Sequence, residues 1–408
     1  MINTFVTEGY LQYKITSTND GYNMTEFKDI PKSSVATDTI LAYSVSIPVG
    51  VTQSYTIEFK YANDESVDQS EDMGKTLSGT LFITEGTEQP TLLSQILNDN
   101  QTIKTRTDFS VTYTETNTGT LFKSTESIAG STPKNVYYFA GNAKNNWVKF
   151  GGFYWRIIRT NHDGSIRLLY SGTSPDTISG YIGTSAFNST SDDSMYVGYM
   201  YGTSGSQASN RANKNNSTIK TFIDNWYSTN LSSYSKYIST EAVYCNDREV
   251  GSGTYSATDL SFYYAAYTRL NTGNPTYNCT NIKDAFSVTN SEAKPIGLMT
   301  ADEIAYAGGK SGTNLPSPYA WYYLNSVGGS ITGSDWWGLL SPRYWDGIDS
   351  NVWKTRGSNR PGNLLNGNVS GASGGVRPAI SLKTCTLWTS GNGAPETPYE
   401  IMETTTGC

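Results

Sequence analysis

The chain has 408 residues and a formal net charge of −7, and only 16% of its residues are charged, against about 25% in ordinary soluble domains. The acidic balance without a basic stretch argues against a nucleic-acid-binding protein. No segment approaches the roughly 18 apolar residues of a membrane-spanning helix. Tyr, Ser, Thr, Asn and Gly supply most of the polarity, which is typical of β-rich extracellular proteins, and the length allows two or three domains.

The first part of the chain, residues 1–87, has the pattern of an all-β sandwich. The segments YLQYKIT, TILAYSVSI, SYTIEFKYA and SGTLFITEG alternate as strands do, and clusters such as STNDGYN form turns between them. Residues 88–134 are polar and Thr-rich, with a short helix expected at LLSQILNDN. We interpret them as a linker that ends near SIAGSTPKN.

Residues 135–408 predict an α+β domain. The segments WVKFGGFYWRIIRT and SIRLLYSG form a hairpin with the turn at 161–164. A helix is expected at 217–231, where apolar residues recur at three- and four-residue spacing. A second helix is expected at 298–309, where Thr300 and Glu303 have the spacing of a capping box and glycine follows the end.

The cysteines favour an oxidising compartment. There are four, and none has a CxxC spacing. Of the three pairings that four cysteines allow, we prefer Cys245–Cys279 with Cys385–Cys408, because each closes a local loop; four free thiols are the alternative. The chain begins MINTFVTEGY, without the regions of a signal peptide. We therefore expect an extracellular or cell-surface protein whose leader and anchor are absent from this chain.

The most informative segment is 336–382. It reads WWGLLSPRYWDGIDSNVWKTRG, then a loose NGNVSGASGG run, then VRPAISL. Tryptophans clustered among Ser, Asn, Gly and Asp indicate a recognition loop on a rigid scaffold. The candidate ligand-binding residues of this loop (342–374) are Arg343, Tyr344, Trp345, Asp346, Asp349, Asn351, Trp353, Lys354, Arg356, Ser358, Asn359, Arg360, Asn363, Asn366 and Asn368.

Within this loop we expect Trp345 and Trp353 to be exposed anchors, with a tryptophan-rich core as the alternative. Arg377 lies in the apolar segment that follows. An arginine in such a strand needs a buried carboxylate or carbonyl partner. We therefore expect Arg377 to be buried and paired, anchoring the loop against the core.

The order of GGFYWRIIR–NHDGSIRLLYSG, KPIGLMTADEIAYAGG, WWGLLSP and GGVRPAISL resembles the C-type lectin-like fold. More narrowly, it is similar to surface proteins of gut Firmicutes and to variable proteins of diversity-generating retroelements. The resemblance covers about residues 135–401 and implies ligand binding on the loop before the last strand, at 342–374. GKTLSGTLFITEG after YTIEFKYANDES looks like the jelly-roll segment of camelysin and related biofilm-fibre proteins, over roughly residues 8–86.

The chain departs from two branches of this fold. Calcium-dependent lectins carry Glu-Pro-Asn or Gln-Pro-Asp and a later Trp-Asn-Asp, and neither occurs here. Formylglycine-generating enzymes need an active-site cysteine or a copper-binding pair. Cys245 and Cys279 do not lie in such a context, and Cys385 ends a strand, so this enzyme class is kept only as an alternative.

We expect no catalytic residue, metal or cofactor. His162 is the only histidine and lies in a hairpin turn, so a Ser-His-Asp triad has no other base. The pairs Asp192–Asp193 and Asp346–Asp349 are interpreted as solvated loop acids, with calcium as the alternative.

The sequence thus predicts a surface-displayed adhesin or receptor-binding protein that recognises a protein or glycan on another cell or phage surface. The first alternative is a structural subunit of an extracellular fibre that self-assembles through the N-terminal sandwich. The second alternative is an enzyme of the formylglycine type.

Overall fold

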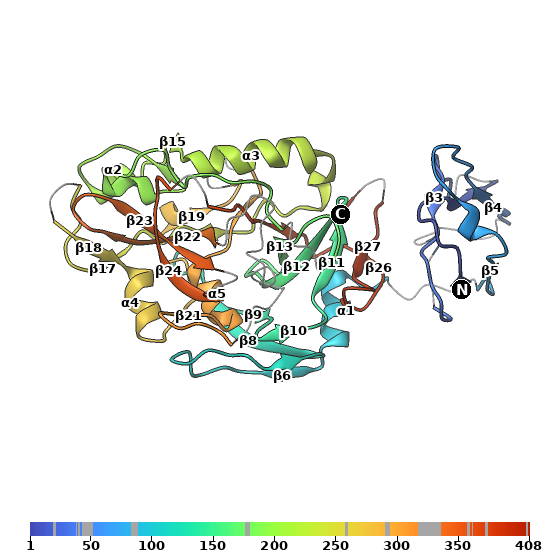
Figure 1. The fold of residues 1–408 in the computed structure, drawn as a ribbon, viewed down its shortest axis with the longest axis horizontal. Helices are drawn as coiled ribbons and strands as arrows, with labels where there is room; N and C mark the ends of the chain where they lie inside the picture. Colours follow the sequence, from blue (N-terminus) through green and yellow to red (C-terminus); the bar gives the residue numbers. More distant parts are fainter. Residues whose placement is uncertain are drawn as a thin grey trace. The chain divides into compact units, whose positions relative to one another are not determined.

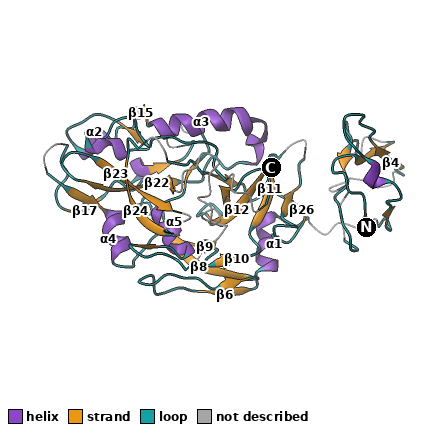
Figure 2. Cartoon of the chain, in the orientation of Figure 1, coloured by secondary structure: helices purple, strands orange, loops and turns teal. Residues whose placement is uncertain are grey.

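The structure is a computed structural model, and the chain forms two compact units, 1–89 and 90–408. It is mostly β-structure with few helices, as Figure 2 shows. The described residues are 1–18, 22–37, 39, 41–42, 52–82, 89–175, 180–257, 260–289, 294–316, 336–356, 360, 362–371, 374–404 and 407–408.

The first unit holds two small sheets, with strand orders β3-β2-β4 and β1-β5. Its elements are β1 (Ile2–Asn3), β2 (Leu11–Ser17), β3 (Lys28–Asp29), β4 (Tyr55–Tyr61), the 3-10 helix η1 (Ser70–Asp72) and β5 (Leu77–Ser78). Strand β2 alternates as a half-buried strand does, and it places Leu11, Tyr13 and Ile15 in the core beside Ile30. The β-rich content agrees with the prediction. Residues 40 and 43–47 of the predicted strand TILAYSVSI and 83–86 of SGTLFITEG lie outside the described residues.

The second unit is built on a ten-stranded sheet and a six-stranded sheet (Figure 1). The ten-stranded sheet contains β6 (Thr102–Lys104), β8 (Thr120–Glu126), β9 (Lys134–Tyr138), β11 (Trp147–Phe150), β12 (Phe153–Thr160), β13 (Ile166–Tyr170), β20 (Gly297–Leu298), β25 (Pro378–Leu382), β26 (Trp388–Ser390) and β27 (Tyr399–Ile401). The six-stranded sheet runs in the order β17 (Val250–Ser252), β18 (Phe262–Tyr264), β22 (Trp336–Trp345), β23 (Ser350–Arg356), β24 (Asn363–Asn368) and β21 (Lys310–Ser311).

Short elements complete this unit. The two-stranded pairs are β7 (Thr116–Asn117) with β10 (Asn142–Ala143), β14 (Met200–Tyr201) with β15 (Asn215–Asn216), and β16 (Tyr244–Cys245) with β19 (Ala285–Phe286). The helices are α1 (Leu92–Asp99), α2 (Gln207–Asn210), η2 (Ser194–Val197), α3 (Thr218–Asn230), η3 (Ser232–Tyr237), α4 (Ala265–Asn271), η4 (Ile282–Asp284) and α5 (Ala301–Ala307). Among the described residues, no helix is both long and apolar enough to cross a membrane.

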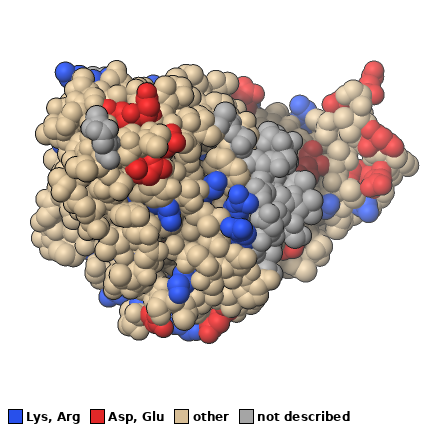
Figure 3. All heavy atoms as spheres, turned by 60° about the vertical axis from the view of Figure 1, so that its left-hand side comes forward, with Lys and Arg blue, Asp and Glu red and all other residues tan. Residues whose placement is uncertain are grey.

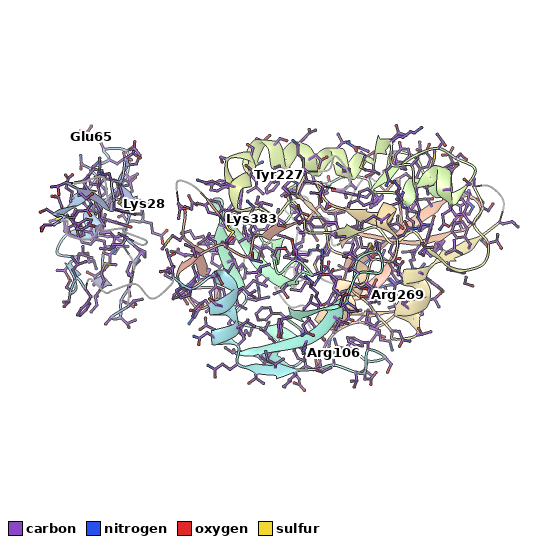
Figure 4. The ribbon with its side chains drawn as sticks, turned by 180° about the vertical axis from the view of Figure 1, so that it is seen from behind. Lys28, Glu65, Arg106, Tyr227, Arg269 and Lys383 are labelled. Atoms are coloured by element: carbon purple, nitrogen blue, oxygen red, sulfur yellow. A yellow bond between two sulfur atoms is a disulfide. The ribbon has the colours of Figure 1, made fainter. Side chains whose placement is uncertain are left out.

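The predicted helices are present. Helix α3 lies one residue inside the expected bounds at each end, and Ser217 caps its N-terminus. Its residues Ile219, Ile223 and Tyr227 are buried in the core. Helix α5 begins at the predicted capping box of Thr300 and Glu303 and ends before Gly308. At its other end, Arg106 (labelled in Figure 4) donates to the backbone oxygens of Ala305 and Tyr306.

The expected linker, 88–134, is not a linker. It contains the predicted helix as α1, but β6 and β8 follow and belong to the ten-stranded sheet, where β8 pairs with β9. Apolar side chains explain this placement, because Leu121 and Phe122 of β8 are buried. The polar residues between α1 and β8 led us to predict a linker. Strand β8 instead pairs with β6 on one edge and with β9 on the other. The boundary between units therefore lies at 89/90.

A buried ion-pair network joins the ten-stranded sheet to α5. Arg159 of β12 and Arg167 of β13 are register neighbours, and both donate to Glu303 Oε1, at 2.8 and 2.7 Å. Arg159 also donates to Glu126 Oε1 at 2.9 Å. All four side chains are buried, so two arginines and two glutamates balance their charges inside the unit. Arg269 of α4 (Figure 4) forms a further set with Asp247 and Asp302.

Both predicted disulfides are present, Cys245–Cys279 and Cys385–Cys408, and no cysteine is free. In the chain-entropy description, loops of this size contribute roughly 3 kcal/mol each by restricting the unfolded chain. Two disulfides are compatible with an extracellular location.

Candidate functional site

The segment predicted as a ligand loop, 342–374, is largely strand. It holds the end of β22, all of β23 and all of β24, which pair in sequence as an antiparallel meander. The cause is the turn Asp346-Gly347 between β22 and β23: Asp346 Oδ1 accepts the backbone N–H groups of Ile348 and Asp349, and Gly347 has a φ of 95°. An Asp-Gly pair is a strong hairpin signal. The expectation of an irregular loop was wrong for this reason.

The register places part of the predicted residue set on one side of this sheet. Asn351 lies opposite Tyr344 and Asn368, and Trp353 lies opposite Asn366. Because side chains alternate along a strand, these five point to the same side. Asn366 Nδ2 donates to the Tyr344 hydroxyl at 3.2 Å, and Asn366 and Asn368 are exposed.

Arg343 joins this side through its guanidinium group. The guanidinium carbon lies 4.7 Å from the ring centroid of Trp353, 5.0 Å from that of Tyr344 and 5.1 Å from that of Tyr267. These distances are within the range of cation–π attraction. Burial lowers the pKa of Arg343, while the neighbouring tyrosines oppose that shift. The arginine is thus half-buried in an aromatic frame.

Two tyrosines outside the predicted segment complete the surface. Tyr263 of β18 lies opposite Tyr344, and its ring stacks on that of Tyr267 of α4 at a centroid distance of 4.1 Å. Sequence reasoning missed them, although a Tyr-x-x-x-Tyr spacing across the start of a helix was a usable signal. We call the set Tyr263, Tyr267, Arg343, Tyr344, Asn366 and Asn368 the tyrosine–arginine face (β18 and β22–β24 with α4 in Figure 1).

The two tryptophans expected as exposed anchors are both buried. Trp345 is 2% exposed and Trp353 is 0% exposed. Trp345 points to the opposite side from Tyr344, into the main core. Trp353 points to the side of the tyrosine–arginine face but lies beneath it, with the rings of Tyr267 and Trp353 stacked at 6.2 Å. Their exposure was therefore predicted wrongly, because an amphipathic strand and not a loop carries them.

The other predicted residues lie apart from this face. Lys354 and Arg356 point to the other side of β23, and Lys354 Nζ lies 4.5 Å from the Trp336 ring centroid. Asp346 shapes the turn, and Asp349 accepts from the Ser191 hydroxyl. Asn363 is buried and bonds to the 312–314 segment. Arg360 is exposed, and Ser358 and Asn359 lie outside the described residues.

Exposed apolar side chains lie at the turn end of this sheet. Ile348, in the β22–β23 turn, is 75% exposed. Leu260 is 64% exposed. It lies toward the same end of the sheet, because Phe262, two residues later, pairs with Trp345 at the end of β22. Two large apolar side chains are thus exposed toward this end of the sheet. Figure 3 shows that uncharged residues cover most of the visible surface of this unit.

Arg377 is fully buried immediately before β25, as expected. Its Nε donates to the backbone oxygen of Tyr170 at 3.1 Å, so it has the carbonyl partner that the sequence required. Its two terminal nitrogens have no hydrogen-bond acceptor among the described residues. Burial lowers the pKa of Arg377 to about 10. The guanidinium therefore lies in the core without a described counter-charge.

Replacing Arg377 by methionine is expected either to leave the free energy of unfolding unchanged or to raise it by about 1–4 kcal/mol. Methionine fills a similar space without a charge to desolvate. Arg377→Ala, which leaves a cavity, should lower it by about 2 kcal/mol or more. Chemical denaturation of the three proteins measures this. A loss in Arg377→Met as large as that in Arg377→Ala would mean that the guanidinium itself stabilises the fold.

The predicted acidic pairs do not form a metal centre in the part of the chain that the structure describes. No group there brings together three His, Cys, Asp or Glu side chains. Asp193 accepts from the backbone N–H of Met195 at the start of η2. His162 lies in the predicted hairpin turn, where its backbone N–H donates to Glu126.

Comparisons with known proteins give no family for this chain. It matches no protein-family model, no curated protein and no solved structure.

Proposed function

We propose that the chain is a surface-displayed binding protein, with a C-type lectin-like second unit, that recognises a partner protein through the tyrosine–arginine face. The observation that carries the proposal is the juxtaposition of three tyrosines, one arginine and two exposed amides on one side of a rigid sheet. Tyrosine gives a large contact area at low entropic cost, and amides give adaptable hydrogen bonds. Tyrosine and arginine are also enriched among residues that dominate binding energy.

The rigidity of this face supports recognition without chemistry. Its side chains come from hydrogen-bonded strands and a packed helix, and Trp353 fills the space beneath them. A surface that is held in its binding conformation loses less entropy when a partner docks. Among the described residues, no group of three His, Cys, Asp or Glu side chains that could hold a metal lies beside it.

The shape of the surface favours a protein over a small ligand. Two small cavities of about 20 and 10 Å³ lie among the described residues of this unit, and neither is lined by a residue of the face. Cavities of this size hold single water molecules, whereas small-ligand pockets measure about 300–1,000 Å³. The exposed Ile348 and Leu260 beside the tyrosines and amides of the face fit the polar and apolar mixture of protein interfaces.

Peptide selection tests this proposal without a known partner. Peptides selected from a phage-displayed random library on the immobilised full chain are expected to bind at this face. Tyr344→Ala should then weaken them by about 2 kcal/mol, or roughly 30-fold. The matched control is Ile103→Ala on β6, because Ile103 is also exposed (45%) but lies in the other sheet. Titration calorimetry on synthetic peptides measures the affinities.

Two outcomes would overturn the proposal. One is that the selected peptides respond to Ile103→Ala and not to Tyr344→Ala, which would place binding elsewhere. The other is that a glycan array yields a glycan whose binding Tyr344→Ala abolishes while no peptide is enriched, which would replace the protein partner by a glycan.

A second candidate function, assembly into a fibre, is favoured by the first unit alone. Its side chains of Phe59, Met73, Leu81 and Phe82 are exposed by 55, 83, 59 and 77%. A small unit with a few buried apolar residues and several exposed ones is a candidate for self-association. Filaments of the full chain in electron micrographs, absent in Phe82→Glu, would support this function. No specific observation favours the formylglycine-type enzyme, because all four cysteines are in disulfides.

A further inference from the structure

The charge environment of Arg343 suggests what the partner must present. Among the described residues, Arg343 takes part in no ion pair, and its Nε is buried without a hydrogen-bond partner. Its described neighbours are the rings of Tyr267, Tyr344 and Trp353. Among the described residues, this half-buried cation thus lacks the carboxylate partner that several arginines of this unit have.

The contrast with those arginines is clear. Arg159, Arg167, Arg248 and Arg269 each contact at least one carboxylate at 3.0 Å or less. These four arginines thus have carboxylates as partners, whereas the fully buried Arg377 has a backbone oxygen as its hydrogen-bond acceptor. Arg343 has aromatic rings instead, which orient a guanidinium group without neutralising it.

The acids nearest in sequence are already engaged in the hairpin turn. Asp346 Oδ1 accepts the N–H groups of Ile348 and Asp349, at 3.0 and 2.7 Å. Asp349 Oδ1 accepts the Ser191 hydroxyl at 2.5 Å. These bonds engage one oxygen of each carboxylate in the turn, and neither carboxylate forms an ion pair with Arg343. Among the described residues, no carboxylate therefore neutralises Arg343.

We infer that the partner protein places a carboxylate, from an Asp or Glu side chain, on Arg343 at the centre of the tyrosine–arginine face. Arginine is the side chain best suited to this, because its planar fork can form two parallel hydrogen bonds to one carboxylate. The surrounding tyrosine rings would exclude water from the pair and strengthen it. Asn366 and Asn368 at the edge can donate to the backbone oxygens of the same peptide segment. This inference rests on the proposed function and adds the chemistry of the partner.

The experiment compares peptides selected on the full chain with peptides selected on Arg343→Gln. Glutamine keeps much of the length and hydrogen bonding of arginine but removes the charge. Peptides selected on the parent are expected to share an Asp or Glu at a fixed position, and those selected on Arg343→Gln should not. For one parent-selected peptide, Arg343→Gln and replacement of the peptide's own acid by its amide should each weaken binding at least tenfold, which is the scale of one hydrogen bond to a charged group. Making both changes together should add little, since they remove the same contact.

The outcomes separate this inference from the proposed function. Peptides that need Tyr344 but carry no shared acid, or that bind Arg343→Gln as well as the parent, would overturn the carboxylate and leave the binding face in place. Peptides indifferent to both Tyr344→Ala and Arg343→Gln would overturn both. Failure to enrich any peptide on the parent would also count against both, because a preorganised face should select some. Circular dichroism of each variant checks that the fold is kept.

Discussion

Glu303→Ala is expected to lower the free energy of unfolding by about 3–5 kcal/mol, the cost of removing one partner from a buried ion pair. Glu303 is buried and accepts from two arginines on neighbouring strands, Arg159 and Arg167. Its other oxygen accepts the backbone N–H of Thr300. Its removal leaves two buried guanidinium groups with Glu126 as their one ion-pair partner among the described residues. Denaturant unfolding followed by tryptophan fluorescence measures the change.

Two controls separate the ion pairs from simpler effects. Thr300→Ala removes the helix cap but keeps the carboxylate, and should cost about 1 kcal/mol. Glu115→Ala removes an exposed glutamate that lies 3.8 Å from Lys104, and should cost less than about 1 kcal/mol. If Glu303→Ala cost no more than Thr300→Ala, the glutamate would act as a cap only and the buried network would contribute nothing.

The same network makes the stability of the fold depend on pH in the acidic range. Burial alone would raise the pKa of Glu126, but Arg159 and His162 outweigh it and hold the pKa at about 2, below the ordinary 4.5. A carboxyl with a lowered folded pKa stabilises the fold above its unfolded pKa, and this contribution is lost as the pH falls from about 4.5 toward 2. Unfolding free energies of the parent should therefore fall over this window, and Glu126→Gln should show a shallower slope. Equal slopes in the two proteins would mean that Glu126 is not paired.

Local patterns predicted the local elements well. The hairpin turn at 161–164, helix α3 and the capped helix α5 each depend on residues within a few positions of one another. The two disulfides also follow the rule of short loops. In each case the physical signal, whether periodicity, a cap or a loop closure, is contained in a single segment.

The remaining features depend on contacts between distant segments. Glu303 was recognised as part of a capping box, but its two arginines lie 144 and 136 residues earlier in the chain. Tyr263 and Tyr267 join Arg343 only because β18 pairs with β22. The Asp346-Gly347 turn was a local signal that the sequence analysis did not use. The two paired strands on either side of it were therefore predicted as a loop. Tryptophans assigned to that loop were consequently expected in water.

Trp345→Ala and Trp353→Ala are each expected to lower the free energy of unfolding by about 3–5 kcal/mol, as large-to-small changes in a core do. Both indoles are almost completely buried, on opposite sides of the same sheet. Tyr344 lies in the same hairpin but is only half-buried. Tyr344→Ala should therefore lower the free energy of unfolding by about 1 kcal/mol or less. Thermal and denaturant unfolding of the three variants measures the difference. Parent-like stability of both tryptophan variants would contradict their burial.

The two tryptophan variants should differ in binding despite their similar cost in stability. Trp353 lies beneath Tyr267 and Arg343, so its removal takes away the support of the tyrosine–arginine face. Trp345 packs into the core on the other side, and its removal leaves those contacts in place. At a temperature where both variants remain folded, a peptide selected on the parent should bind Trp353→Ala at least tenfold more weakly than Trp345→Ala. Equal binding by both variants would mean that Trp353 does not support the tyrosine–arginine face. The contacts of Arg343 with Tyr267 and Tyr344 would then be enough to hold its guanidinium group.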